Sequence, residues 1–213
     1  MKLRSKAILI LVVTLCLLLP LSKLAIAQFS DIEGYWAERQ ISDWLDKGAV
    51  TGYPDGTFAP ANSITRAEFI TLVNKLLGFH EKAQVTFNDV SKNDWFYEEV
   101  SKARAAGYMI GYEDNTLHPG NPIKREEVST VIFRLLDMEE GQDSSSLYQF
   151  EDAVIISSWA KPSVAEVVDY KLMKGYPDRT FKPLDYITRA EALVTLDNLF
   201  WFKHPVLITP LDY

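Results

Sequence analysis

Residues 52–68 read Gly-Tyr-Pro-Asp-Gly-Thr-Phe-Ala-Pro-Ala-Asn-Ser-Ile-Thr-Arg-Ala-Glu, and two later segments of the chain repeat this pattern. Each copy joins Gly-Tyr-x-Asp-x-Thr to a proline and then to an Arg-x-Glu sequence. The first glycine recurs at Gly52, Gly111 and Gly175, at offsets of 59 and then 64 residues. A period this long indicates whole supersecondary units packed against one another. The sequence therefore predicts three copies of one small unit.

Upstream of each segment the chain repeats Phe-x-Asp, a tryptophan and an apolar periodicity typical of a helix. The copies start at Phe29, Phe87 and Phe150. In the first copy Ala37 and Ile41 fall on one face of the predicted helix. Gly48 and Gly107 follow at the place where a left-handed residue ends a helix. The third copy has Lys171 there, so its helix is expected to end differently.

The loop after this helix is predicted to contain a tight turn. Proline, aspartate and glycine at positions 54–56 suit such a turn, and Gly56 accepts a positive φ. Asn115 suits the same position in the second copy, whereas Arg179 suits it less well in the third. The apolar residues that follow are expected to plug the loop: Phe58, Leu117 and Phe181.

The second helix of each copy has its own start signal. Thr65 and Glu68 form a capping box, in which each side chain accepts a hydrogen bond from the backbone N–H of the other residue. Thr188 and Glu191 repeat it. The second copy has Lys124 at the cap, which cannot accept a hydrogen bond, so that helix is expected to lack roughly 1 kcal/mol of capping stabilisation.

Equivalent apolar stripes follow these caps, for example at Phe69, Leu72, Val73 and Leu76. Three equivalent helices can bury such stripes against one another. The sequence therefore predicts a mainly α fold, in which three helix-loop-helix repeats form a pseudo-threefold, three-pronged spindle around a central three-helix bundle. A monomer with this internal pseudo-trimer is expected.

The chain divides into six parts. They are a signal peptide (1–27), repeat 1 (28–84), repeat 2 (85–140), a polar linker (141–149), repeat 3 (150–202) and a C-terminal tail (203–213). The signal peptide is predicted from a basic start, an apolar stretch and the small-x-small sequence at residues 25–27. A retained membrane anchor is the alternative, but the apolar stretch is short and Pro20 interrupts it. Export to a bacterial cell surface is expected.

Composition narrows the classes of ligand. Four of the 22 basic residues lie in the signal peptide, which leaves 18 against 29 acidic residues and a net charge of about −11. Such a chain is not expected to bind nucleic acid or anionic lipid through its overall field. An anionic polymer would need individually positioned cations. The single cysteine, Cys16, lies in the signal peptide and the three histidines are scattered, so no metal or other cofactor is predicted.

Arg66, Arg125 and Arg189 lie in the first turn of the second helices, where a cation opposes the helix dipole. One hypothesis is an ion pair with an aspartate of a neighbouring copy. These aspartates are Asp31, Asp89 and Asp152. The other hypothesis is a carboxylate-binding pocket, made by the guanidinium and the free N–H groups of the helix N-terminus. The two hypotheses are compatible.

The recurring tryptophans also allow two interpretations. Trp36, Trp95 and Trp159 each precede a helix, where a tryptophan usually packs into the core or against the helix start. Together with a tyrosine and an arginine of each copy, they could instead line an aromatic and polar groove. Such grooves bind sugars by stacking on apolar ring faces, while polar groups bind the hydroxyls.

The joint pattern resembles the S-layer homology (SLH) family of bacterial surface proteins. The resemblance is carried by Phe29-Ser-Asp31, Trp36-Ala37, Gly52-Tyr53-Pro-Asp55-Gly56-Thr-Phe58-Ala-Pro60 and Ile64-Thr65-Arg66-Ala67-Glu68. It covers nearly all of residues 28–202. It implies ligand grooves between adjacent repeats that bind the secondary cell-wall polysaccharide attached to peptidoglycan. In the family the bound group is commonly a terminal N-acetylmannosamine with a ketal-linked pyruvate, whose carboxylate suits an arginine.

The resemblance implies the following ligand-binding residues, copy by copy. They are Asp31, Trp36, Gly52, Tyr53, Arg66 and Glu68; Asp89, Trp95, Gly111, Tyr112 and Arg125; and Asp152, Trp159, Gly175, Tyr176, Arg189 and Glu191. Lys124 and Arg179 depart from the motif, so the grooves are not expected to be equal. The groove that uses Arg66 is predicted to bind best, and Arg66→Ala to weaken binding.

Three functions remain open. The first is a non-catalytic carbohydrate-binding module that holds a protein on the cell wall. The second is a small structural or assembly protein of the envelope, which recruits a protein partner through the apolar residues from Trp201 onward or tethers an outer membrane to peptidoglycan. The third is a glycosidase, which the sequence disfavours because the repeats already explain its carboxylates. No catalytic residue is predicted.

Overall fold

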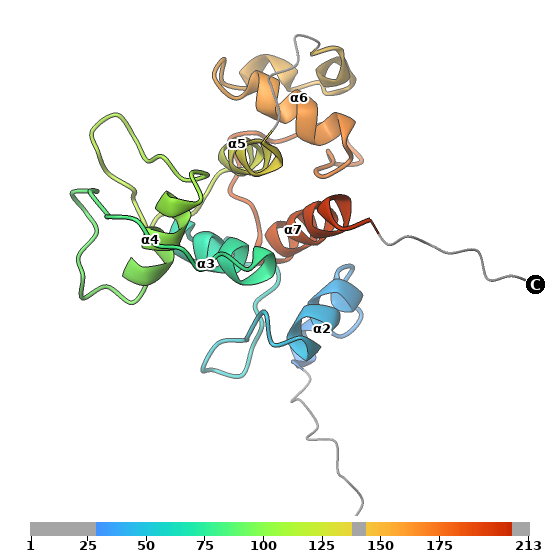
Figure 1. Cartoon of the computed structure of the whole chain (residues 1–213). Coiled ribbons are helices and arrows are strands. Elements are labelled where there is room, and N and C mark those ends of the chain that lie inside the picture. Colours follow the sequence, from blue (N-terminus) through green and yellow to red (C-terminus); the bar gives the residue numbers. More distant parts are fainter. Residues whose placement is uncertain (1–28, 138–143, 206–213) are drawn as a thin grey trace, which may run out of the picture.

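The computed structural model describes residues 29–137 and 144–205. The described residues form six α-helices and three short 3-10 helices, with no strand. Three helices, α3 (Arg66–Leu77), α5 (Arg125–Leu136) and α7 (Arg189–Lys203), surround the centre of the molecule (Figure 1). The predicted spindle with its central bundle is confirmed. The predicted signal peptide and residues 206–213 of the predicted tail lie outside the described residues.

The first helices of the three copies form the prongs. They are α2 (Glu38–Asp46), α4 (Tyr97–Ala105) and α6 (Lys161–Asp169). Each begins two residues after its tryptophan, so the tryptophans precede the helices. Each prong helix packs on the central helix of another copy: α4 on α3, α6 on α5, and α2 on α7 (Figure 1). The last pair joins the first repeat to the third and closes the molecule into a ring.

Aromatic packing and a hydrogen bond fix the closing pair. The ring of Trp44 on α2 meets the ring of Phe200 on α7 edge to face, at 5.1 Å between centroids. The indole Nε1 of Trp44 donates to Asp197 of α7 at 2.9 Å. Such a pair contributes about 0.5–1.5 kcal/mol beyond its buried area. The first repeat is therefore packed against the third repeat as well as against its neighbour in sequence.

A ring of backbone hydrogen bonds lies on the pseudo-threefold axis. Ile64 N–H donates to Ile187 O, Ile187 N–H donates to Ile123 O, and Ile123 N–H donates to Ile64 O, at 3.0 to 3.2 Å. All three isoleucines are buried. The three helix starts therefore meet at one point of the fold, which the repeat spacing alone does not show.

The next repeat also satisfies the first N–H groups of each central helix. The N–H groups of Arg66 and Ala67 donate to Asn121 O and Pro119 O, at 2.9 and 3.0 Å. The equivalent donors of α5 bond to Asp185 O and Pro183 O, and those of α7 to Asn62 O and Pro60 O. A helix N-terminus leaves four such donors without a partner inside the helix. Here the loop carbonyls of another copy accept hydrogen bonds from two of these four donors.

The capping predictions are confirmed at the residue level. The capping boxes of Thr65 with Glu68 and of Thr188 with Glu191 are both present. No hydrogen bond to a side chain caps α5 at Lys124, although Lys124 N–H still donates to Glu127 at 2.9 Å. The second copy therefore keeps half of the box.

The predicted difference at Lys171 is wrong. Lys171 has φ 58°, close to the 68° of Gly48 and the 76° of Gly107, so the third prong helix ends in the same left-handed conformation. Arg179 likewise adopts φ 61°, as Asn115 does. A left-handed residue other than glycine costs about 1–3 kcal/mol. The packing of the repeat overrides the local preference at both positions.

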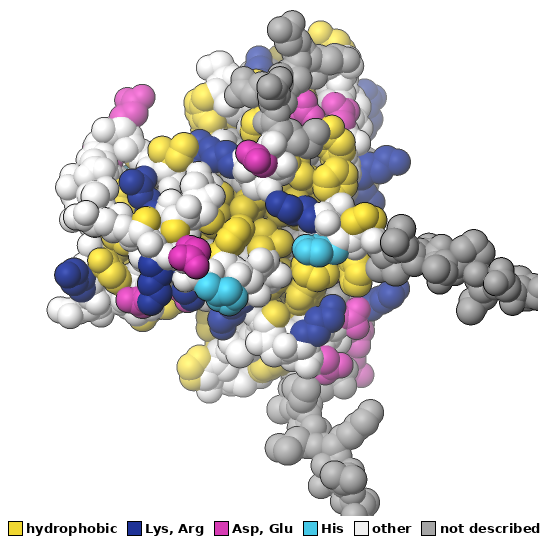
Figure 2. Space-filling model, viewed as in Figure 1, with side chains coloured by type: hydrophobic (Ala, Val, Ile, Leu, Met, Phe, Trp, Pro, Cys, Tyr) yellow, Lys and Arg dark blue, Asp and Glu magenta, His cyan; other side chains and the backbone are white. Residues whose placement is uncertain are grey.

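Part of the predicted linker is folded. Residues Ser145–Gln149 form the 3-10 helix η2, which packs on α6 and buries Leu147. Two further 3-10 helices lie at the Phe-x-Asp sequences of repeats 1 and 3: η1 (Ser30–Ile32) begins within the sequence, and η3 (Ala153–Ile155) follows it. The loop residues Phe58, Leu117 and Phe181 are buried, which confirms them as apolar plugs. Hydrophobic side chains also show between the prongs on the face drawn in Figure 2.

Candidate functional site

The arginine that begins each central helix points into the next repeat. The guanidinium of Arg66 donates from Nε to Leu117 O at 2.7 Å and from Nη1 to Glu127 at 3.1 Å. It also lies over the ring of Tyr112, 4.8 Å from the centroid. Arg66 is only 5% exposed. Its charge is therefore neutralised inside the protein.

The other two arginines make the same kind of contact less completely. Arg125 donates from Nε to Phe181 O at 2.9 Å, and its Nη1 lies 3.7 Å from Glu191. Arg189 is partly exposed, its Nη1 donates to Tyr53 Oη at 3.1 Å, and its Nε has no partner within the described ranges. The three sites share one design, but Arg189 is held more loosely.

Two hypotheses about these arginines are wrong in detail. The helix N-termini do not offer free N–H groups beside the guanidinium, because loop carbonyls of the next repeat already accept from the first two residues. The ion-pair partners are glutamates of the next repeat, not the predicted aspartates. The sequence shows only residue types, so it does not show whether an aspartate or a glutamate of the neighbouring copy lies beside each arginine.

The aspartates instead hold the loops of their own copies. Asp31 accepts from the N–H groups of Phe58 and Ala59, the latter at 2.7 Å. Ala59 has φ 54°, a left-handed conformation, so the carboxylate stabilises a strained turn. Equivalent bonds run from Leu117 and His118 to Asp89, and from Phe181 and Lys182 to Asp152. The predicted site aspartates therefore shape the loops that bear the tyrosines.

The recurring glycines are required by close packing. A Cβ on Gly52 would lie 2.1 Å from the ring of Phe29 and 2.7 Å from Thr57 O. Gly111 and Gly175 meet the rings of Phe87 and Phe150 in the same way. The phenylalanine of Phe-x-Asp thus packs directly on the glycine, and no larger residue fits without movement.

The tyrosine after each glycine faces the central helix of its own copy. Tyr53 donates its hydroxyl to Glu68 at 2.8 Å, Tyr112 to Glu127, and Tyr176 to Glu191 at 2.5 Å. Burial, and then the bond to Glu127, raise the pKa of Tyr112 to about 12. Burial would raise the pKa of Glu68, but hydrogen bonds from Thr65 and Tyr53 outweigh it and lower that pKa. The tyrosine and glutamate of one copy therefore form a linked polar network with the arginine of the preceding copy in the ring.

The tryptophans are exposed, so the interpretation that places them in the core is wrong. Trp36, Trp95 and Trp159 are all more than half exposed. An exposed indole has apolar area that a ligand can cover. The groove interpretation of these residues is the one that the geometry favours.

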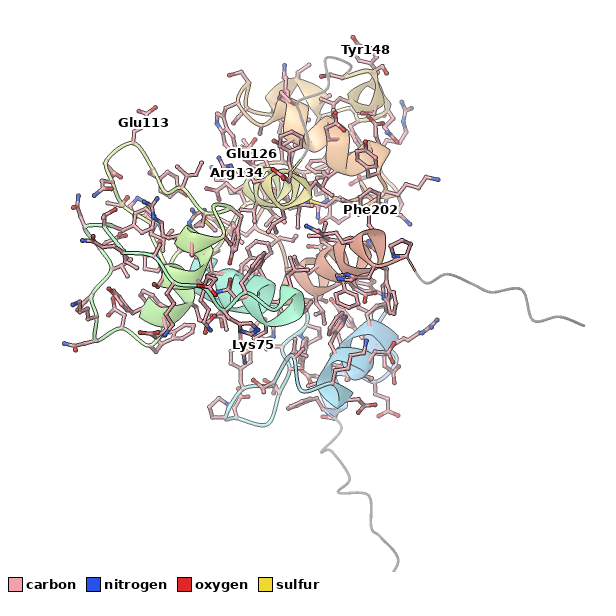
Figure 3. All side chains as sticks on the ribbon, in the orientation of Figure 1. Lys75, Glu113, Glu126, Arg134, Tyr148 and Phe202 are labelled. Carbon is pink, nitrogen blue, oxygen red and sulfur yellow. The ribbon has the colours of Figure 1, made fainter. Side chains whose placement is uncertain are left out.

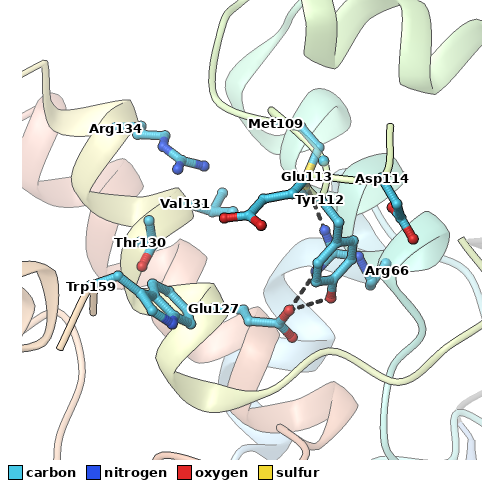
Figure 4. Close-up of a pocket in the computed structure, with 11 residues that line it drawn as sticks. Arg66, Met109, Tyr112, Glu113, Asp114, Glu127, Thr130, Val131, Arg134 and Trp159 are labelled. Atoms are coloured by element: carbon cyan, nitrogen blue, oxygen red, sulfur yellow. Dashed lines mark hydrogen bonds and ion pairs between the residues drawn. The ribbon is translucent and has the colours of Figure 1, made fainter. Parts of the chain in front are cut away.

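A pocket of about 530 Å³ combines these parts, and we call it the Arg66 groove. Repeat 1 supplies Arg66, repeat 2 supplies Tyr112, Glu127 and its loop, and repeat 3 supplies Trp159 (Figure 4). Arg134 and Trp159 lie across the pocket from Arg66. The groove therefore draws on all three repeats, where the resemblance implied two.

A second pocket, of about 270 Å³, repeats this arrangement, and we call it the Arg189 groove. Here repeat 3 supplies Arg189, repeat 1 supplies Tyr53 and Glu68, and repeat 2 supplies Trp95. Arg125 and Tyr176 pair in the same way at the third junction, where the symmetry of the repeats would place Trp36. At this junction the ammonium group of Lys182 lies 4.3 Å from the ring centroid of Tyr176. The equivalent residues of the other two copies are Ala59 and His118, which have no ammonium group. The grooves are therefore unequal.

Sequence reasoning missed a second cation in each of the two pockets. Arg134 lines the Arg66 groove, and Lys75 lines the Arg189 groove at the equivalent position of α3 (Figure 3). Both side chains are exposed. Partial burial of its guanidinium in the groove, and then the charge of Arg66, lower the pKa of Arg134. Each lies nine residues after its arginine, whereas the third copy has Asn198 there. The shared offset of these two cations from their arginines is visible in the sequence and could have identified them as a repeated feature.

Two negative findings apply to residues 29–137 and 144–205. No group of three His, Cys, Asp or Glu side chains in these ranges could hold a metal ion. None of the helices described is long and apolar enough to cross a membrane.

Three helical repeats close into a ring, and aromatic and cationic grooves lie where they meet, so the fold is a closed repeat architecture and not one built around a single cleft. The chain belongs to the S-layer homology domain family. The sequence pattern of that family matches residues 28–70, 86–129 and 149–193, which together make up more than half of the chain. The predicted membership and the number of repeats are confirmed.

Several curated proteins are similar over most of this chain. A cellulosome-anchoring protein of Acetivibrio thermocellus is 34% identical over 69% of the chain. Exoglucanase XynX of the same species is 32% identical over 80%, and S-layer protein EA1 of Bacillus anthracis is 29% identical over 77%. The matched regions make up 34%, 16% and 19% of those three proteins. The chain thus corresponds to a minor part of each relative.

Proposed function

We propose that this chain is a non-catalytic module that anchors protein to a bacterial cell wall by binding secondary cell-wall polysaccharide. The proposed ligand group is a pyruvylated N-acetylmannosamine at the end of that polymer. Relatives that are named as cellulosome-anchoring and S-layer proteins support a role at the cell surface. In the relative named as an exoglucanase, the match is a small part of the protein, which agrees with a binding role.

One observation carries this proposal. The Arg66 and Arg189 grooves both place an exposed tryptophan of one repeat beside a tyrosine that is backed by a buried or half-buried arginine. An exposed indole can stack on the apolar face of a sugar ring, while the polar groups bind its hydroxyls. The repetition of this combination in two sites argues for a common, repeating ligand. Two weak sites on one polymer would add avidity.

The second cation is the better partner for a carboxylate. The charge of Arg66 is offset by Glu127, whereas Arg134 is exposed and donates only to Tyr108 O, at 3.3 Å, among the hydrogen bonds of the described residues. Lys75 is equally exposed in the Arg189 groove. Within the proposal, Arg134 and Lys75 meet the carboxylate of the pyruvate, and Arg66 and Arg189 shape the grooves.

Co-sedimentation with purified sacculi tests the proposal. The chain should sediment with sacculi that carry the secondary polymer and stay in solution after its chemical removal. Arg134→Gln should weaken binding about tenfold or more, because a charge-assisted hydrogen bond is worth roughly 1.5–3 kcal/mol. The matched control is Arg39→Gln, since Arg39 is an exposed arginine of α2 outside both grooves. Equal binding to bare peptidoglycan, or binding to neither, would overturn the choice of ligand.

A protein partner is the second candidate function. Trp201 and Phe202, in the last turn of α7, remain exposed. Deletion of residues 203–213 separates the alternatives for this end of the chain. Loss of solubility would indicate that the deleted residues pack on the bundle, and loss of partner capture by a folded protein would indicate recruitment.

A further inference from the structure

Three departures from the repeat pattern meet at one place in the fold. Lys124 stands where the other copies have Thr65 and Thr188. Tyr186 and Leu184 belong to the third copy, and their counterparts in the first are Ser63 and Ala61. Although Lys124 and Tyr186 are 62 residues apart, they lie opposite each other in an antiparallel bridge. Substitutions in two different copies thus contribute to a single surface.

That surface is a pocket of about 260 Å³ beside the Arg66 groove. The two pockets share Tyr112, Glu127 and Trp159, so they form one continuous trough. Trp159 lies at the edge of the Arg66 groove (Figure 4) and also lines the pocket of Lys124 and Tyr186. A chain-like ligand bound in the first pocket could therefore continue past the indole into the second.

A fourth departure positions the shared tryptophan. Glu126, where the other copies have alanine, is 2% exposed and accepts from both the N–H and the hydroxyl of Ser157, each at 3.0 Å. Ser157 lies two residues before Trp159. A buried carboxylate with two donors fixes the backbone that carries the indole. Glu126 is thus a positioning residue for Trp159.

The apolar substitutions do not serve packing. Tyr186 is 53% exposed and Leu184 is 43% exposed, so much of their surface remains in water. The ammonium group of Lys124 has no hydrogen bond or ion pair with any residue in the described part of the chain. An aromatic ring, an aliphatic side chain and an unpaired cation around one hollow suit a sugar with a negatively charged substituent.

We propose that the pocket of Lys124, Leu184 and Tyr186 is a second subsite, which binds the next sugar unit of a glycan held in the Arg66 groove. The continuity through Trp159 identifies the occupant as part of the same glycan chain. This proposal rests on the proposed function and deepens it. The subsite gives one groove a preference for longer fragments, built from residues that the other two copies do not have.

Calorimetric titration with wall-polymer fragments tests the subsite. The probes are acid-released fragments of the polymer from sacculi, separated by size into single sugar units and chains of two to four units. The wild-type chain should bind the longer fragments at least about tenfold more tightly than the single unit. The triple variant Lys124→Thr, Leu184→Ala, Tyr186→Ser restores the residues of the first copy and should bring this ratio close to one.

A control variant outside both pockets accompanies this titration. Tyr148→Ser removes an exposed tyrosine far from both pockets and should leave the ratio unchanged (Figure 3). If the triple variant keeps the wild-type ratio, the subsite is refuted while wall binding stands. If no fragment binds to the wild type, the proposed function itself fails. Should the triple variant not fold, Tyr186→Ser alone must still lower the ratio, and an unchanged ratio in that variant would refute the subsite.

Discussion

Arg66→Ala should destabilise the fold strongly, because the side chain serves the structure more than it faces a ligand. The substitution removes the bond from Nε to Leu117 O, the ion pair with Glu127 and the contact with the Tyr112 ring. Each partner belongs to repeat 2, so the change loosens the junction between two repeats.

The expected magnitude follows from these contacts. Breaking a buried ion pair by removing one partner costs about 3–5 kcal/mol. Glu127 is 15% exposed and keeps the donors Tyr112 Oη and Lys124 N, which places the cost near the lower end, at about 3 kcal/mol. With a urea m value of roughly 2 kcal/mol/M, the unfolding midpoint should fall by about 1.5 M.

Urea unfolding followed by circular dichroism measures this shift. Arg39→Ala is the matched control, since Arg39 is 90% exposed and lies 3.9 Å from Asp43, and such a pair contributes at most about 1 kcal/mol. The double variant with Glu127→Gln should show a coupling free energy of about 0.5–3 kcal/mol.

A loss below about 1 kcal/mol in Arg66→Ala would refute this reasoning. The guanidinium would then be available to a ligand, as the interpretation from the sequence supposed. If the loss is large, weak wall binding by this variant reports a disordered groove, and Arg134→Gln is the variant that reports ligand contact.

Two further predictions concern the loops and the polar network. Gly52→Ala should cost roughly 1–3 kcal/mol, since its Cβ would lie 2.1 Å from the Phe29 ring. Gly120→Ala, with nothing within 4 Å, should change the free energy of unfolding by about 0.5 kcal/mol or less. Equal effects of the two substitutions in thermal unfolding would count against the packing argument. Because the pKa of Tyr112 is raised from 10 to about 12, its contribution to stability is complete below pH 10 and is lost as the pH rises toward 12. Because the pKa of Glu68 is lowered from 4.5, its contribution is present above pH 4.5 and is lost below it. Denaturation midpoints across both ranges check the signs, and a midpoint independent of pH would contradict them.

The repeated sequence predicts the architecture well, because local signals agree with the global fold. The capping box at Thr65 and the apolar stripe of α3 are visible in the sequence and present in the structure. The number of repeats and the central bundle follow from these features. The pairing of α2 with α7 does not, because three equivalent stripes carry no information about which prong packs on which central helix.

The site is harder to predict, because a residue type does not show which way its side chain faces. Asp31 and Gly52 match the family motif, yet the carboxylate of Asp31 binds the loop backbone and Gly52 receives a phenylalanine ring. The sequence does not single out Arg134, because most arginines on a helix surface are exposed to solvent without a binding role. Only the position of Trp159, which comes from another repeat, places Arg134 in a groove.

The mixing of repeats in each groove constrains how this protein can change. The first repeat gives Arg66 to one groove, Tyr53 to another and, by symmetry, Trp36 to the third. A duplicated repeat that replaced its neighbour would therefore alter every groove at once. Single substitutions such as the lysine at position 124 touch one junction only, so they can change one groove while the other grooves keep their lining residues. Specificity in such a ring evolves junction by junction and not copy by copy.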